Sequence, residues 1–110
     1  MTDYRLDVLG ALATEIAARK TASPDQSYTA KLISQGVEKC AKKLGEEAIE
    51  TSLAAVVRDK PHIAAESADL LYHLLVLLEA TEVSLSDVMV ELERRRGVGG
   101  LVERAARREG

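Results

Sequence analysis

The stretch of sequence that most constrains the fold is residues 70–78, which read Leu-Leu-Tyr-His-Leu-Leu-Val-Leu-Leu. A helix over these residues is apolar around nearly its whole circumference, so it has to be covered on most sides. A chain of 110 residues has few other helices to cover it. We therefore expect a helical bundle with this helix at its centre, completed by a second copy of the chain as a homodimer.

The rest of the chain also favours helices. Apolar residues recur at helical spacing between capping residues and breakers, and only three residues are aromatic, all of them Tyr. The sequence predicts an all-α fold of four to five helices in a single domain over residues 1–110, with 97–110 as a flexible basic tail. The expected helices run from Asp3 to about Arg19, from a Ser27 cap to about Gln35, from Val37 to about Arg58, from Pro61 to about Ala80, and from a Ser84 or Ser86 cap to about Arg96.

Composition excludes several classes of function. A net charge of −3 gives no global reason to expect nucleic-acid binding, which depends on clustered Lys and Arg. The longest strictly apolar run, residues 74–78, is far shorter than the roughly 20 residues that span a bilayer, so no membrane partner is expected. One cysteine, Cys40, forms neither an internal disulfide nor a multi-thiolate zinc site, and it is interpreted as a small apolar filler. A reducing cytoplasm fits this composition.

The first group of candidate functional residues is acidic and lies between residues 37 and 58. At about 100° per residue, Glu46 and Glu50 fall about 40° apart on a helix, and Glu47 is their neighbour. Leu53 and Val57 lie within roughly 20° of Glu46 on the same helix. The carboxylates are therefore expected to share an apolar stripe instead of opposing it.

A second acidic pair repeats this pattern on the next helix. Glu66 lies within roughly 40° of Leu70, His73 and Leu77, and Asp69 follows it by about one turn. This pair therefore begins a stripe that is otherwise expected to be core. His73 is either a ligand or a hydrogen-bond donor at the acidic site, or an ordinary core residue.

Two explanations fit the five acids. They form a solvated surface paired with Lys42 or Lys43, or they bind a divalent metal that offsets the cost of placing carboxylates on buried stripes. Oxygen ligands with little His and no Cys cluster suit Mg²⁺, with Mn²⁺ as a substitute. A di-iron site is excluded, because it needs Glu-x-x-His on two helices and no Glu here is followed by His three residues later.

Basic residues near the acids are candidate phosphate ligands. Lys31 and Lys43 are expected to supply counter-charge to metal-bridged phosphates. Lys39, Lys42 and the run at 94–96 are better explained as solvated helix flanks or contacts with the helix dipole. The tail arginines at 104, 107 and 108 either fold over a polyanion or remain solvated.

Three segments carry a resemblance to a known family. They read Ser-Tyr-Thr-Ala-Lys-Leu at 27–32, Lys-Leu-Gly-Glu-Glu-Ala-Ile-Glu at 43–50, and Glu-Ser-Ala-Asp-Leu-Leu-Tyr-His-Leu at 66–74. Over about residues 16–96 the chain resembles the phosphoribosyl-ATP pyrophosphohydrolases of histidine biosynthesis. The acidic segments alone indicate the wider all-α nucleotide pyrophosphohydrolase superfamily, and the segment at 27–32 narrows the resemblance to this family.

The resemblance implies a helical dimer that uses Mg²⁺ to hydrolyse phosphoribosyl-ATP to phosphoribosyl-AMP and pyrophosphate, the second step of the pathway. Some family members are fused to a cyclohydrolase with zinc-binding Cys and His residues, and this chain is similar to the stand-alone form. The metal-binding acids implied by the resemblance are Glu46, Glu47, Glu50, Glu66 and Asp69.

In such a reaction water attacks the α-phosphorus while charge builds on the leaving pyrophosphate. Either Glu47 or Glu50 is expected to accept the proton of the water. The resemblance also implies that lysines hold phosphates, that hydroxyls donate hydrogen bonds, and that a tyrosine packs on the base or ribose. These substrate-binding residues are Ser27, Tyr28, Thr29, Lys31 and Lys43.

Two further hypotheses remain open on the sequence alone. The same acidic motifs serve enzymes that act on other nucleoside triphosphates, canonical or damaged. The apolar helix over residues 70–78 is also compatible with a non-catalytic helical dimerisation module.

Overall fold

The computed structural model describes residues 4–97, and all regular structure in that range is helical. The expected all-α fold is therefore confirmed over the described residues, and the tail at 98–110 lies outside them. The helices are α1 (Asp7–Arg19), α2 (Tyr28–Ser34), α3 (Val37–Val56), α4 (Lys60–Ala80) and α5 (Leu85–Arg95).

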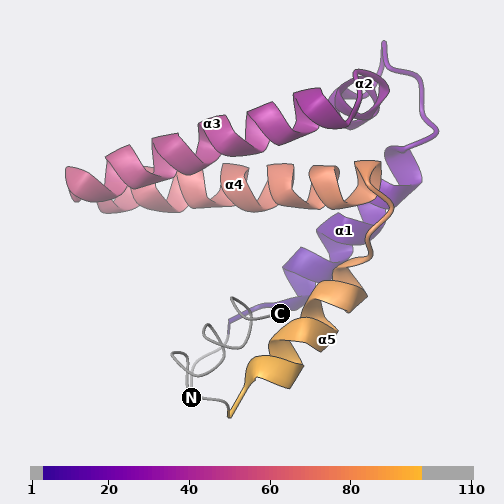
Figure 1. The fold of residues 1–110 in the computed structure, drawn as a ribbon. Helices are drawn as coiled ribbons and strands as arrows, with labels where there is room; N and C mark the ends of the chain where they lie inside the picture. Colours follow the sequence, from indigo (N-terminus) through magenta and orange to yellow (C-terminus); the bar gives the residue numbers. More distant parts are fainter. Residues whose placement is uncertain (1–3, 98–110) are drawn as a thin grey trace.

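The longest helices, α3 and α4, form an antiparallel pair that packs along its whole length (Figure 1). Arg58, with a φ of 60°, turns the chain between them. The Asp59 carboxylate then accepts a hydrogen bond from the backbone N–H of His62 at 3.3 Å and caps α4. Pro61 lies in the first turn of α4, where its missing N–H costs nothing. This turn fixes which residues of the two helices face each other.

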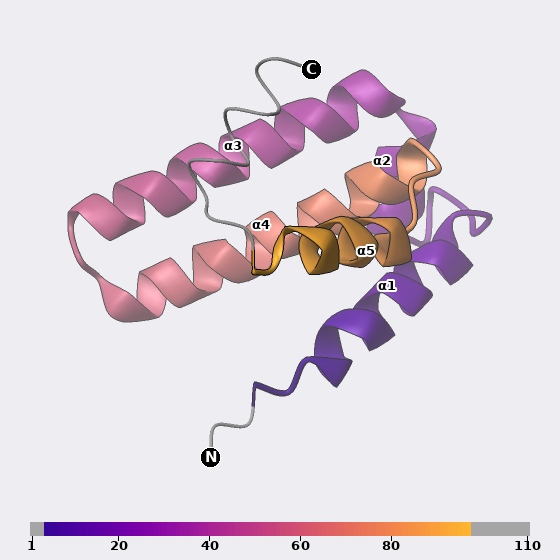
Figure 2. The ribbon, with the colours of Figure 1, turned by 60° about the horizontal axis from the view of Figure 1, so that its bottom comes forward.

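The helix that contains residues 70–78, α4, lies at the centre of the described fold, as expected. It packs against α1, α2 and α3, and Figure 2 shows α1 and α2 near its C-terminal half. The core gathers where these helices meet, and the Cys40 thiol lies in it and donates to the carbonyl of Leu32 at 3.4 Å. The buried core residues are Ile16, Leu32, Cys40, Leu75 and Val76.

Several helix boundaries differ from the expected ones. Helix α1 begins at Asp7 instead of Asp3, because Arg5 has a φ of 51° that a continuous right-handed helix cannot include. Helix α3 ends at Val56, two residues before the left-handed Arg58. Of the two proposed caps for the last helix, Ser84 is the one that accepts a hydrogen bond, from the backbone N–H of Asp87 at 3.0 Å.

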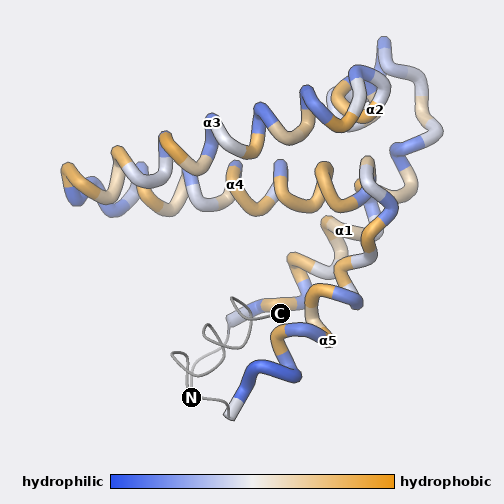
Figure 3. The backbone as a smooth tube through the Cα atoms, viewed as in Figure 1, coloured by the Kyte–Doolittle hydropathy of each residue, from blue (hydrophilic) through white to orange (hydrophobic). Residues whose placement is uncertain are grey.

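The apolar stripe that was expected to be buried on α3 is exposed in the single chain, which corrects the sequence-based expectation. The side of α3 that faces α4 contains the buried residues Cys40 and Ala54. Leu53 and Val56 lie on another side and are 58% and 76% exposed. Figure 3 shows hydrophobic residues continuing to the end of α3 that is remote from α2. The residues of this exposed face are Ile49, Leu53, Val56 and Val57.

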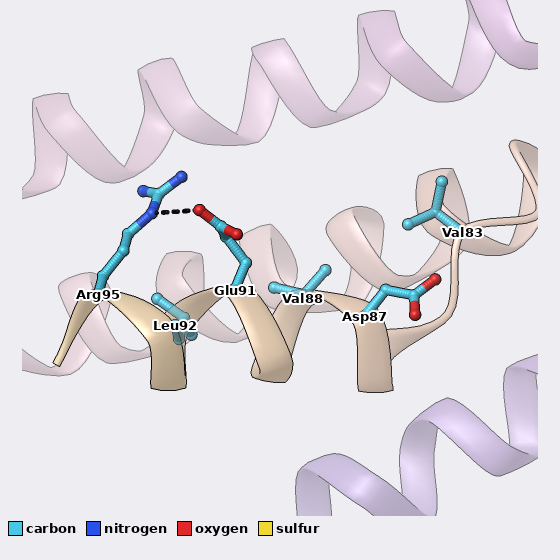
Figure 4. A pocket seen from close by; sticks show the side chains of 6 residues that line it. All are labelled: Val83, Asp87, Val88, Glu91, Leu92 and Arg95. Carbon is cyan, nitrogen blue, oxygen red and sulfur yellow. Dashed lines mark hydrogen bonds and ion pairs between the residues drawn. The ribbon is translucent and has the colours of Figure 1, made fainter. Parts of the chain in front are cut away.

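Helix α5 packs only lightly against the rest of the described chain, and none of its residues is buried. Along it runs an open hollow of about 290 Å³ with mostly apolar walls, in which Glu91 pairs with Arg95 (Figure 4). No helix among residues 4–97 is both long and apolar enough to cross a bilayer.

Candidate active site

Three of the predicted acids meet between α3 and α4. Glu47 comes from α3, and Glu66 and Asp69 come from consecutive turns of α4. One carboxylate oxygen from each of them lies within 4.8 Å of the other two. In the sequence, Glu47 lies before the turn at 57–59 and the α4 acids lie after it. The antiparallel packing of the two helices brings these carboxylates together.

The electrostatics of this carboxylate cluster are unfavourable without a cation. Burial raises the pKa of Glu47 above its ordinary value, and the nearby Asp69 and Glu66 raise it further. The Glu47 side chain is 17% exposed, so water screens the repulsion only partly. Carboxylate oxygens are the ligands that hard divalent cations prefer, and a cation here would reverse the sign of each of these interactions. The three residues present therefore fit a divalent metal.

Two histidines lie against the carboxylate cluster. His73 is 6% exposed, and its Nε2 lies 3.9 Å from Oε1 of Glu47. Burial lowers the pKa of His73 and the nearby Lys43 lowers it further, which favours the neutral form of the imidazole. Its Nδ1 is buried and has no hydrogen-bond partner among the described residues. At the outer side, Nε2 of His62 lies 3.2 Å from Oε1 of Glu66.

An aromatic wall connects the carboxylate cluster to α2. Tyr28 stacks on Tyr72 with ring centroids 6.3 Å apart, and Tyr72 meets His73 edge to face at 5.0 Å. The Tyr72 hydroxyl shares a 2.6 Å hydrogen bond with the hydroxyl of Thr29, which is buried. Tyr28 itself is 54% exposed, so part of the residue is open to solvent at the surface.

Two neighbouring hollows adjoin this wall. The first has a volume of about 480 Å³ and is lined by Pro24, Asp25, Gln26, Ser27, Tyr28 and Lys31. The second, called here the lysine pocket, has a volume of about 210 Å³ and is lined by Tyr28, Lys31, Leu32, Gln35, Lys39 and Lys43. Tyr28 and Lys31 belong to both, so the two hollows lie next to each other at α2.

Lys43 connects the lysine pocket to the acids. Its Nζ lies 3.4 Å from Oε1 of Glu46. The neighbouring Tyr28 phenol raises the pKa of Lys43 most, and Glu46 and Glu47 add to the effect, so the ammonium remains charged. A phosphate between Lys43 and the carboxylate cluster would therefore meet a fixed positive charge on one side.

The predicted site residues are thus only partly brought together. Glu46 and Glu50 are exposed and do not belong to the group of three carboxylates. The Ser27 hydroxyl caps α2 by accepting from the backbone N–H of Ala30 at 3.1 Å. The Thr29 hydroxyl points into the interior and contacts the hydroxyl of Tyr72. The contact expected between Thr29 and the substrate stays a prediction.

Three contributors were not anticipated from the sequence. Tyr72 lies one turn after Ala68 and Asp69, and its hydroxyl contact with Thr29 spans 43 residues, which local spacing does not reveal. His62 precedes Glu66 by four residues, a helical spacing that does signal the pair. Lys39 was interpreted as a solvated flank, yet it lines the same pocket as Lys31 and Lys43.

Fold and site together define an all-helical protein with a candidate carboxylate metal centre beside a pocket suited to phosphates. The sequence profile of the phosphoribosyl-ATP pyrophosphohydrolase family matches residues 9–96. The chain belongs to this family.

Individual relatives match over most of their length. A protein named phosphoribosyl-ATP pyrophosphatase from Cereibacter sphaeroides is 54% identical over 102 residues, which cover 93% of this chain and 99% of the relative. One of the same name from Dinoroseobacter shibae is 53% identical over 102 residues, covering 93% and 100% of the two chains. Another from Agrobacterium fabrum is 56% identical over 92 residues, covering 84% and 86%. The resemblance stated from the three sequence segments is confirmed.

Proposed function

We propose that this chain hydrolyses 1-(5-phosphoribosyl)-ATP to 1-(5-phosphoribosyl)-AMP and pyrophosphate, the second step of histidine biosynthesis. Membership of the family, with relatives of that name that align over nearly their whole length, supports this substrate. The observation that carries the chemistry is the carboxylate cluster of Glu47, Glu66 and Asp69 beside the lysine pocket. A cytoplasmic location fits an enzyme of amino-acid biosynthesis.

The cofactor proposed for this site is Mg²⁺, with Mn²⁺ as a substitute. Glu47, Glu66 and Asp69 would hold it, and Glu46 and Glu50 are the further acids assigned to metal by the family resemblance. When bound, the cation lowers the pKa of water and shields the charge of the phosphates.

The remaining steps belong to residues of this chain. The water oxygen forms a bond to the α-phosphorus, the bond from that phosphorus to pyrophosphate breaks, and a carboxylate takes the proton of the water. Glu47, whose pKa is raised by its surroundings, and Glu50, which is exposed, are the two candidates for that base. Lys31 and Lys43 attract the phosphates, while Tyr28 offers its exposed ring face to the base or ribose.

The functional unit is proposed to be a homodimer. The exposed apolar face of α3 leaves Leu53 and Val56 in water, and a second copy is the partner that would cover such a face with a matching one. At about 100° per residue, Glu46 lies within the angular range of this face, between Leu53 and Val57, and Glu50 lies between the face and Glu47. Covering the face would therefore also bring these two carboxylates closer to the enclosed part of the site.

The activity is tested by incubating the purified protein with phosphoribosyl-ATP, and separately with a panel of common nucleoside triphosphates, with and without Mg²⁺. Pyrophosphate and the nucleoside monophosphate are both measured. We expect Mg²⁺-dependent release of pyrophosphate from phosphoribosyl-ATP in preference to the others. Faster release from another triphosphate would contradict the substrate and retain the site, whereas release from none would favour a non-catalytic dimerisation module.

A further inference from the structure

The lysine pocket contains more positive charge than the three sequence segments suggested. Lys31 lies on α2, one turn before Gln35, and Lys39 lies on α3, one turn before Lys43. The packing of α2 against α3 directs all four side chains to one hollow of about 210 Å³. Three lysine side chains and one glutamine side chain therefore line the same space.

These lysines are not neutralised within the pocket. No acidic residue is among those that line it. Among residues 4–97, Lys31 and Lys39 form no ion pair, and Lys43 pairs only with Glu46, which lies outside the lining. Like charges one helical turn apart repel each other, so Lys39 and Lys43 destabilise α3 slightly when nothing is bound. An anion with several oxygens would remove this repulsion.

The pocket also lies at a defined distance from the carboxylate cluster. Lys39, Lys43 and Glu47 follow one another at intervals of four residues on α3, so they lie along one side of the helix. At a rise of about 1.5 Å per residue, Lys39 is about 12 Å along the axis from Glu47. Lys43 lies between them, with its ammonium already beside Glu46.

We propose that the lysine pocket binds the phosphate monoester of the phosphoribosyl group, and that Lys39 is a specificity-determining residue for it. This inference rests on the proposed function, since phosphoribosyl-ATP carries a triphosphate at one end and a single phosphate at the other. The triphosphate belongs at the carboxylate cluster, and the separate phosphate monoester then needs its own positive site. Ordinary ATP has no such second phosphate, so the pocket distinguishes the two nucleotides.

The geometry suits a substrate that extends between the two positions. Tyr28 lines the lysine pocket and stacks on Tyr72 next to His73, which contacts Glu47. Its exposed ring therefore lies between the two phosphate positions, where the sugar or base of the substrate would pass.

The test compares Lys39→Gln with the wild-type chain. Four quantities are measured: KM and kcat for phosphoribosyl-ATP, and the inhibition constants of ribose 5-phosphate and of ATP against phosphoribosyl-ATP turnover. Losing one charged hydrogen bond to phosphate is expected to raise KM about tenfold and to leave kcat unchanged. The inhibition constant of ribose 5-phosphate is expected to rise by a similar factor. The inhibition constant of ATP is expected to stay the same.

Lys42→Gln is the matched control, because Lys42 is exposed on the same helix and does not line the pocket. It removes the same charge from the whole molecule and is expected to change none of the four quantities. Circular dichroism of both variants checks that the helices remain intact.

The outcomes separate this inference from the proposed function. An unchanged KM in Lys39→Gln, or a loss of ATP inhibition as large as the rise in KM, overturns the inference and leaves the hydrolase standing. The second of these results would assign the pocket to the triphosphate. Absence of phosphoribosyl-ATP turnover by the wild-type chain would overturn both.

Discussion

Glu47 is the residue at which the proposed metal site conflicts most directly with the stability of the fold. Its carboxylate is held near Asp69 and Glu66, and its raised pKa records the cost of that arrangement when no cation balances it. Packing between α3 and α4 holds the three carboxylates close together despite their repulsion, because this side of α3 is in contact with α4. A site of this kind is stabilised by its ligand more than by its own contacts.

We therefore expect Glu47→Gln to raise the melting temperature of the metal-free protein by about 2–4 °C, because one repelling charge is removed. The same change is expected to abolish the rise in melting temperature that Mg²⁺ produces and to lower turnover at least about 100-fold. Thermal unfolding with and without Mg²⁺, together with the pyrophosphate assay, measures these effects. Glu15→Gln, an exposed change on α1, is the control.

The assigned site is wrong if Glu47→Gln and Glu50→Gln both leave turnover of phosphoribosyl-ATP unchanged. A loss in one variant and not in the other identifies which of the two carboxylates is needed. If metal-free Glu47→Gln melts at a lower temperature than the metal-free wild-type chain, the expectation is contradicted. The Glu47 carboxylate would then stabilise the fold through a favourable contact that outweighs the repulsion.

The hydrogen bond between Thr29 and Tyr72 gives a second prediction at this scale. Tyr72→Phe leaves the buried Thr29 hydroxyl without its 2.6 Å partner, which is expected to cost about 1 kcal/mol of unfolding free energy. The double variant with Thr29→Val is expected to lose less than the sum of the single losses, because both sides of the contact are then removed. Urea unfolding of the four proteins measures the coupling, and additive losses would contradict it.

At the scale of elements, α5 is the helix whose stability depends least on packing. It has no buried residue, so its own side chains and the Ser84 cap maintain it. Glu91 accepts hydrogen bonds from Arg94 at 2.7 Å and from Arg95 at 3.0 Å, which lower the pKa of Glu91 from 4.5 to about 2.

Because the pKa of Glu91 is lowered in the folded state, these ion pairs stabilise α5 above pH 4.5 and are lost as the pH falls toward 2. We expect the amide signals of α5 to shift over this pH range, in an NMR titration, while those of the buried part of α4 do not follow the same curve. Glu91→Gln is expected to remove the transition. A Glu91 carboxyl that titrates near pH 4.5 would show that the ion pairs do not form in solution.

At the scale of the whole molecule, the exposed apolar face of α3 predicts assembly. Leu53→Lys places a charge in the middle of this face and is expected to convert the proposed dimer to a monomer at micromolar concentration. Sedimentation velocity measures the change. Ala48→Lys adds the same charge at an exposed position on another side of α3 and is expected to leave the dimer intact.

A wild-type chain that sediments as a folded monomer at that concentration would contradict the dimer. If Leu53→Lys and Ala48→Lys weaken assembly equally, the interface involves a different surface, such as the lightly packed α5.

Features that depend on neighbours a few residues apart could be predicted from the amino-acid sequence. Caps such as Ser27 and Ser84, the break at Gly36 with its φ of 96°, and the helical spacing of the acids all depend on local contacts. These features sufficed to predict the all-α fold and the central position of α4, and they singled out the acidic residues as candidates. The early start expected for α1 was wrong, because the backbone at Arg5 is left-handed and no residue type there signals it.

Contacts between side chains from distant segments could be found only in the folded chain. The tertiary structure joined Glu47 to Glu66 and Asp69, turned Thr29 inward to Tyr72, and placed Lys39 with Lys31 around one pocket. The reason is physical: helical periodicity fixes the face on which a residue lies, but the partner of that face is set by how α2, α3 and α4 pack across loops. The exposed stripe on α3 shows the same limit, since an apolar face has the same periodicity whether the chain itself or a second copy covers it.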